Sequence, residues 1–162
     1  VSRESKRIES LVIVLFRFNE EVPASKFLET RVEYVASRFI DRADAGRENQ
    51  SITAVVSAHT DSIGPEYAND QLSKARAERE LNNMRRYMMY LLDLTEQSQL
   101  DKWLDDRNVS LVAKGHGEGT PYEILRRTGK TVERVLLGEN AYPEGRTVNR
   151  RVLLELETTQ QN

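Results

Sequence analysis

The sequence predicts an α/β sandwich of the α+β type, in which helices pack on one face of a mixed sheet of about four strands. Short runs rich in Val, Ile and Leu at residues 8–18 and 52–58 indicate two of the strands. The segments that follow these runs repeat apolar residues at spacings of three and four, which indicates helices. The expected order is strand-helix-strand-helix-strand-strand.

The composition is typical of one folded domain. The chain has 162 residues, 38% of them hydrophobic and 31% charged, which suits a single domain over residues 1–162. A net charge of -2 argues against a broad nucleic-acid-binding surface, and the absence of cysteine excludes disulfides and thiolate metal sites. No apolar run approaches the roughly 20 residues of a membrane-spanning helix. Because the chain lacks an initial Met and begins close to a strand, we expect a domain excised from a longer protein.

The first half predicts a strand, a helix and a second strand. After the strand at residues 8–18, Pro23 suits the first turn of a helix. The helical stripe is Leu28, Val32, Val35 and Phe39, and a polar loop at residues 41–50 follows it. Residues 52–58 then form a strand rich in β-branched residues.

A second helix is expected to begin near Leu72, with Ser73 as its cap and Arg76 in its first turn. Its apolar stripe comprises Leu81, Met84, Met88 and Leu91. Basic Arg76 is disfavoured by the dipole at a helix start, which points to a role in holding an anion.

The remaining elements are a short helix at residues 97–107, a strand at 109–113 and a last strand at 150–157, with a frayed tail at 158–162. The segment at 122–137 allows two interpretations. Leu125, Val132 and Val135 suit a helix, whereas Thr128 and Gly129 suit the turn of a hairpin. The residues leave both open, as they leave open a solvated surface excursion or a contact with a partner.

Four blocks of residues resemble the OmpA-like peptidoglycan-binding domain, which is shared by porin tails, Pal-type lipoproteins and MotB-type stator proteins. The blocks are Phe16-Arg17-Phe18-Asn19; His59-Thr60-Asp61 with Gly64, Asn69, Leu72-Ser73 and Arg76-Ala77; Gly115-His116-Gly117-Glu118-Gly119-Thr120-Pro121; and Gly145-Arg146-Thr147-Val148-Asn149-Arg150-Arg151-Val152. They occur in the order of the family pattern and span most of the chain. The segment at 122–137 departs from that pattern, because the family usually crosses this interval in fewer residues.

The resemblance implies that Asp61 pairs with the ammonium of diaminopimelate in a peptidoglycan stem peptide, and that Arg76 holds the carboxylate on the same carbon. It places Asn69 and Thr60 beside the ligand, and Arg150 near the pocket. On the residues alone, an aspartate in this position is more often a turn-former than a ligand-binding residue, and Arg76 is an exposed partner of Glu80. Arg151 alternates to the opposite face and is expected to be structural or solvated.

No cofactor and no metal are expected. His59 and His116 lie in separate turns, and nothing in the sequence makes them converge with Asp61 or Glu118 into the three or four ligands of a zinc site. A metal-dependent hydrolase using Asp61 or Glu118 is therefore a weak alternative, since no motif for a nucleophile or a zinc helix is present.

The resemblance implies a non-catalytic domain that binds peptidoglycan in the periplasm of a Gram-negative bacterium. It would anchor an envelope protein whose attachment to the outer or inner membrane lies outside this sequence. A second alternative is a protein-interaction domain that uses residues 122–137, and a homodimer stays open. No nucleic-acid partner is expected.

Overall fold

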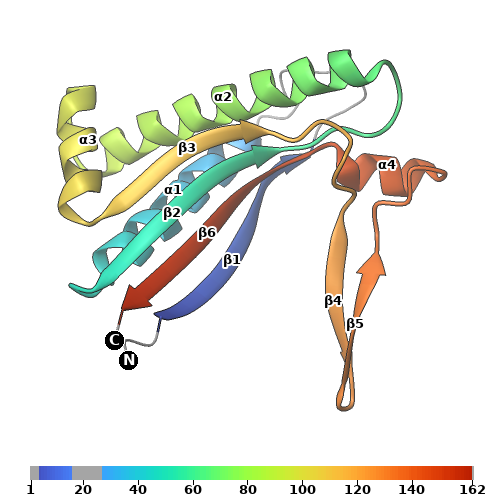
Figure 1. Cartoon of the computed structure of the whole chain (residues 1–162). Helices are drawn as coiled ribbons and strands as arrows, with labels where there is room; N and C mark the ends of the chain where they lie inside the picture. Colours follow the sequence, from blue (N-terminus) through green and yellow to red (C-terminus); the bar gives the residue numbers. More distant parts are fainter. Residues whose placement is uncertain (1–3, 16–26, 162) are drawn as a thin grey trace.

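Four strands form a mixed sheet in the order β1-β6-β2-β3 in the computed structural model, which describes residues 4–15 and 27–161 (Figure 1). These strands are β1 (Glu4–Leu15), β2 (Gln50–Ala58), β3 (Val109–Gly115) and β6 (Arg151–Gln161). β6 lies antiparallel to both β1 and β2, whereas β2 and β3 are parallel neighbours. The predicted four-stranded mixed sheet is confirmed.

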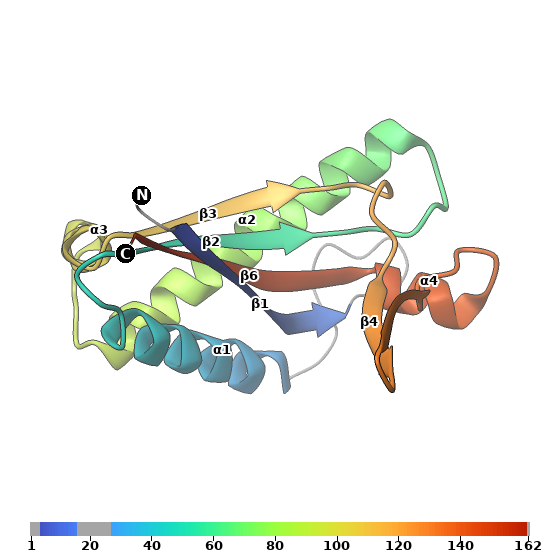
Figure 2. The same ribbon diagram turned by 60° about the horizontal axis from the view of Figure 1, so that its bottom comes forward.

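The long helices α1 (Phe27–Asp44) and α2 (Glu66–Leu91) pack against each other and cover one face of this sheet (Figure 2). The shorter α3 (Gln97–Asp106) contacts α2 and β3. Apolar residues at helical spacing on α1 and α2 meet every second residue of β2 and β6, as both periodicities require. The fully buried members of this core include Val35, Phe39, Ala54, Val56, Met84, Met88, Val152 and Leu154.

The start of α2 was predicted wrongly. The helix begins at Glu66 rather than near Leu72, so Arg76 lies nearly three turns inside it and Ser73 is not its cap. Pro65 has the backbone angle that a helix entry requires, and acidic Glu66 is favoured in the first turn by the helix dipole. Pro65 and Glu66 therefore start the helix within residues 66–71, whose polar composition is typical of a loop.

Two further boundaries differ from the prediction. α1 continues to Asp44, which removes the first residues of the loop expected from position 41. The expected frayed tail belongs to β6, whose pairing with β1 runs as far as Glu4 with Gln161. Both neighbours of β6 continue alongside it, so its last residues gain ladder hydrogen bonds on two sides.

The segment at 122–137 contains a hairpin. β4 (Glu123–Thr128) and β5 (Thr131–Leu136) pair antiparallel in a separate two-stranded sheet that projects from the domain (Figure 1). The turn is Gly129-Lys130, and Gly129 has φ 63°, the left-handed conformation that two-residue hairpin turns need. The helical interpretation of this segment was therefore wrong. α4 (Pro143–Asn149), which follows the hairpin, was not predicted.

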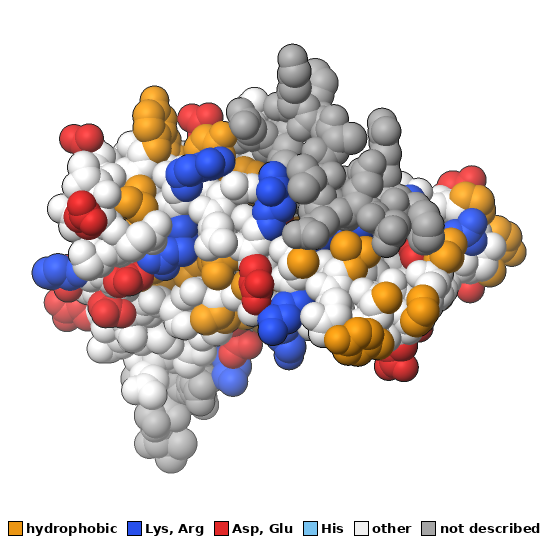
Figure 3. All heavy atoms as spheres, turned by 90° about the horizontal axis from the view of Figure 1, so that it is seen from above, with side chains coloured by type: hydrophobic (Ala, Val, Ile, Leu, Met, Phe, Trp, Pro, Cys, Tyr) orange, Lys and Arg blue, Asp and Glu red, His pale blue; other side chains and the backbone are white. Residues whose placement is uncertain are grey.

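The predictions for residues 16–26 fall outside the described residues; they concern the end of the first strand with the block Phe16-Arg17-Phe18-Asn19, and Pro23 in the first turn of a helix. Within the described residues, no helix is both long and apolar enough to cross a membrane. Acidic and basic side chains are interspersed on the face seen in Figure 3, without a broad area of one sign.

Candidate functional site

The loop after β2, the first half of α2 and the residue after α4 surround a cavity of about 200 Å³. All the residues predicted to bind ligand line it, namely Thr60, Asp61, Asn69, Arg76 and Arg150. They come from two of the four sequence blocks, which the fold brings to one end of the sheet. Apolar and backbone groups of Ile63, Gly64, Pro65, Ala68 and Leu72 form the remaining walls.

Asp61 is almost fully buried and makes two charge-stabilising contacts. Its Oδ2 accepts a hydrogen bond from Nη1 of Arg150 at 2.7 Å, and its Oδ1 accepts one from the backbone N–H of Ile63 at 3.1 Å. The second contact is the turn-forming bond that aspartate often makes two residues along the chain. The ion pair with Arg150 was not predicted; the sequence placed Arg150 only near the pocket.

Arg76 has no exposed surface, and its Nη1 donates to the carbonyl oxygen of His59 at 3.4 Å. Its planar group of N–H donors lies in the wall of the cavity. Glu80, the partner expected for an exposed Arg76, is itself fully buried and makes an ion pair with Arg79 at 3.9 Å.

Thr60 and Asn69 connect the cavity to the glycine-rich block at residues 115–121. The N–H of Thr60 donates to the carbonyl oxygen of Gly117, and Nδ2 of Asn69 donates to Oε2 of Glu118 at 2.6 Å. Oγ1 of Thr60 is buried and has no hydrogen-bond partner among the described residues. A buried hydroxyl without a partner costs free energy, so it is available to a ligand group that enters the cavity.

The charged residues that line the cavity are one carboxylate and two guanidiniums, Asp61, Arg76 and Arg150. Asp61 and Arg150 form an ion pair with each other, and Arg76 is the second guanidinium in the cavity wall. The arrangement can therefore accept an anion beside Arg76 and can offer Asp61 to a cation.

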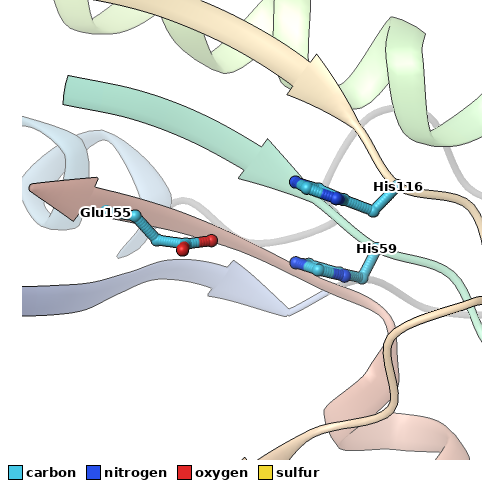
Figure 4. Close-up of side chains that lie close together, drawn as sticks. All are labelled: His59, His116 and Glu155. Carbon is cyan, nitrogen blue, oxygen red and sulfur yellow. The ribbon is translucent and has the colours of Figure 1, made fainter. Parts of the chain in front are cut away.

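The two histidines, expected in separate turns, lie together. Their rings stack with centroids 4.6 Å apart and planes 5° from parallel, and Glu155 of β6 lies beside them (Figure 4). The pairing of Ala58 with Gly115 in β2 and β3 provides the reason, because His59 and His116 are the next residue of each parallel strand. That register is the signal that sequence reasoning missed. Neither Asp61 nor Glu118 joins this cluster, since they bind Arg150 and Asn69.

Burial, and to a smaller extent the positive charge of Arg151 and the neighbouring His116, together lower the pKa of His59 to about 3. The pKa of His116 is also lowered, mainly by burial and then by Lys114.

Arg151 is not solvated but buried. It lies over the ring of Tyr122 at 4.9 Å and donates to the carbonyl oxygen of Thr120. Of the two roles expected for Arg151, structural or solvated, the structure shows the structural one.

Comparison with solved structures supports the fold predicted from the sequence blocks. The C-terminal domain of Helicobacter pylori MotB superposes with a TM-score of 0.53 at 13% identity, covering 90% of this chain and 83% of that chain. The periplasmic domain of the same protein gives 0.51 at 14% identity, covering 92% and 80%. The chain thus has the fold of the OmpA-like domains.

A peptidoglycan-associated lipoprotein from Burkholderia pseudomallei gives a TM-score of 0.49 at 19% identity, covering 91% of this chain and 88% of that chain. This value is too low to bear on the function of the present chain. No protein-family model and no curated protein matches the sequence.

Proposed function

We propose that this domain binds peptidoglycan without catalysis, by holding the free end of a diaminopimelate side chain in a stem peptide. The observation that carries the proposal is the convergence of Asp61, Arg76 and Arg150 on one small cavity. Asp61 and Arg76 are each at least 98% buried, at 2% and 0% exposure, so their charges act in an environment with little screening by water.

The free end of diaminopimelate carries an ammonium and a carboxylate on one carbon atom. Arg76 binds the carboxylate through its planar fork of donors, and Asp61 binds the ammonium. Because Asp61 is already paired with Arg150 at 2.7 Å, the ammonium exchanges one cation for another and leaves no buried carboxylate uncompensated. Arg150 then adds its charge to the carboxylate side of the ligand.

The size of the cavity limits what it accepts. Its volume of about 200 Å³ is smaller than the roughly 300–1,000 Å³ of a site that encloses a whole small molecule. A charged amino-acid head group fits this volume and can pair with Asp61 and Arg76, whereas an uncharged sugar ring cannot. The peptide branch of the wall polymer, rather than its glycan strand, is therefore the proposed ligand.

Binding of this kind tethers the domain to the cell wall in the periplasm, and through it the envelope protein to which the domain belongs. The likeness in fold to the periplasmic domain of MotB supports this location. Asp61 and Glu118, the residues of the hydrolase alternative, are engaged by Arg150 and Asn69, which suits a binding role better than acid-base chemistry.

Replacement of the pocket carboxylate tests the proposal. Asp61→Asn keeps the size of the side chain and the bond to Ile63 but removes the charge that attracts the ammonium. We expect this variant to lose at least tenfold in affinity for purified peptidoglycan, because a charge-assisted contact of about 1.5–3 kcal/mol is lost. Sedimentation with purified sacculi measures it, and thermal melting reports whether the fold persists.

Asp106→Asn is the matched control. Asp106 is exposed on α3, far from the cavity, and pairs with Lys102 in a surface ion pair that contributes little to stability. Its sedimentation with sacculi should equal that of the unchanged protein. A folded Asp61→Asn variant that sediments equally well would refute the proposed role of the cavity.

The hairpin favours a second function, contact with a partner protein. Its apolar side chains Leu125, Val132 and Leu136 are 71%, 54% and 44% exposed, and the two strands belong to a sheet of their own. The hairpin leaves and rejoins the domain at one point, where the carbonyl oxygen of Tyr122 accepts from the N–H groups of Leu137 and Gly138.

Deletion of residues 123–136 with a short glycine-serine link separates the two functions. Since the hairpin contributes nothing to the described cavity, we expect sedimentation with sacculi to be unchanged, while self-association or partner capture decreases. Light scattering and sedimentation measure the two outcomes. Loss of sacculus binding in a deletion variant that still melts cooperatively would place the binding surface on the hairpin instead.

A further inference from the structure

A cluster of two imidazoles and one carboxylate lies on the face of the sheet that the helices do not cover. It consists of His59, His116 and Glu155, and it is separate from the cavity formed around Asp61. Each residue comes from a different strand or its end, β2, β3 and β6 respectively. In Figure 4 the carboxylate of Glu155 points toward the edges of both stacked rings.

The backbone register places the two histidines side by side, and Glu155 reaches them along β6 from four residues further on (Figure 4). His59 and His116 follow the paired residues Ala58 and Gly115, and the N–H of His116 donates to the carbonyl oxygen of Ala58 at 2.9 Å. On the other side of β2, Glu155 pairs with Val55. One ligand atom from each of the three side chains lies within 4.8 Å of the other two.

Three of the four ring nitrogens of this cluster lack a hydrogen-bond partner among the described residues. His59 is 3% exposed, and within the described residues neither its Nδ1 nor its Nε2 has a hydrogen-bond partner; the same holds for Nε2 of His116. Burying polar atoms in this way costs free energy unless something else satisfies them. A ring nitrogen that carries no proton has a lone pair to donate to a metal ion.

We propose that His59, His116 and Glu155 bind a divalent transition-metal ion of the zinc type. Two imidazole nitrogens and one carboxylate oxygen are a ligand set suited to Zn²⁺, whereas Mg²⁺ and Ca²⁺ require oxygen ligands. With bonds of about 2.0–2.2 Å at tetrahedral angles, donor atoms lie about 3.4 Å apart. Metal binding therefore requires side-chain rotations that bring the three donors closer and turn the parallel rings toward one centre.

A fourth ligand position faces a groove between the open face of the sheet and the hairpin. This groove has a volume of about 440 Å³ and is lined by His59 and Glu155 together with Tyr122, Ile124 and Leu125. Three protein ligands with one open position leave that position to water or to a donor from a molecule in the groove.

Arg151 and Lys114 are the cations that face the cluster, and Glu155 is the carboxylate that offsets them. The positive charge of Arg151, which acts on both histidines, would repel a cation bound between them. Replacing it by an uncharged residue, Arg151→Gln, therefore tightens metal binding, whereas the same change would weaken binding of an anion at this place.

Calorimetric titration of the untagged chain with ZnCl₂ tests the proposal. The chain contains only two histidines, both in the cluster. A polyhistidine tag must be absent, because it would bind zinc itself. We expect one saturable site. His116→Ala and Glu155→Gln should each lower its affinity by about tenfold or more, since even loss of a group that supports a ligand often costs that much. MgCl₂ should give no saturable heat.

Glu157→Gln is the matched control, because Glu157 is the next residue of β6 on the same face and pairs with exposed Lys6. It should leave zinc affinity unchanged. Circular dichroism establishes that each variant is folded. The assignment would be overturned if both His116→Ala and Glu155→Gln bound zinc as tightly as the unchanged protein. It would also be overturned if the unchanged protein showed no saturable binding at millimolar ZnCl₂.

Discussion

The carboxylate of Asp61 combines a structural and a proposed binding role in one side chain. One oxygen fixes the turn after β2 through the N–H of Ile63, and the other is held by Arg150. The turn-forming and ligand-binding interpretations of this residue are therefore compatible, although sequence reasoning treats them as alternatives. An aspartate whose position is fixed in advance loses little side-chain entropy when a ligand arrives.

Glu80, on the buried face of α2, illustrates the cost of an ionisable residue in the core. It is fully buried, and this burial raises its pKa, while Asn83 and Arg79 act in the opposite direction. In the folded protein Glu80 therefore binds a proton more readily than in the unfolded chain. The stability that protonation confers is present below the ordinary pKa of 4.5 and is lost as pH rises through the raised value.

We predict that Glu80→Gln raises the melting temperature at pH 7, because the uncharged amide avoids the desolvation of a carboxylate. The difference from the unchanged protein should shrink as the pH is lowered toward 4.5. Thermal melting across this range measures it. Glu78→Gln, at an exposed position of the same helix, should show neither effect. A lower melting temperature for Glu80→Gln at pH 7 would mean that its ionised form stabilises the fold.

At the scale of elements, the close approach of β3 to α2 positions the glycine-rich block beside the cavity. A Cβ atom on Gly115 would lie 2.5 Å from the backbone nitrogen of Lys74 and 2.7 Å from Oγ of Ser73. Ser73 in turn accepts a hydrogen bond from the N–H of Gly117, whose carbonyl oxygen binds Thr60. The serine expected to cap α2 instead joins the helix to this block.

We predict that Gly115→Ala lowers the free energy of unfolding by about 1–3 kcal/mol, because α2 must move away from the end of β3. Gly119→Ala is the control in the same block, where the nearest atom to an added Cβ is the carbonyl oxygen of His116 at 3.9 Å. Urea denaturation compares the two variants. Equal unfolding free energies would show that helix and strand adjust without cost.

The elements that the sequence predicts well are those in which periodicity and burial agree. The α1 stripe of Val32, Val35 and Phe39 and the alternation of β6 both face the core. The start of α2 was missed because its first residues are polar and form the cavity wall rather than the core. α4 is short and has only two buried residues, Gly145 and Asn149, so no apolar period marks it.

At the scale of the whole molecule, the sequence predicts which residues gather at the cavity but not how they pair. The family blocks brought together Thr60, Asp61, Asn69, Arg76 and Arg150, and the fold places all of them at one cavity. The ion pair between Asp61 and Arg150 joins residues 89 positions apart. The histidine cluster depends on the register of two parallel strands. Long-range pairings of this kind leave no local signal in a single sequence.

The central claim, that the cavity recognises an ammonium and a carboxylate on one carbon atom, is tested most directly with the unaltered protein. Calorimetry should compare a stem peptide containing meso-diaminopimelate with the same peptide amidated at the free carboxylate. Because amidation removes the anion that Arg76 binds, we predict that affinity falls by about tenfold or more. Equal affinity for the two peptides would contradict the account.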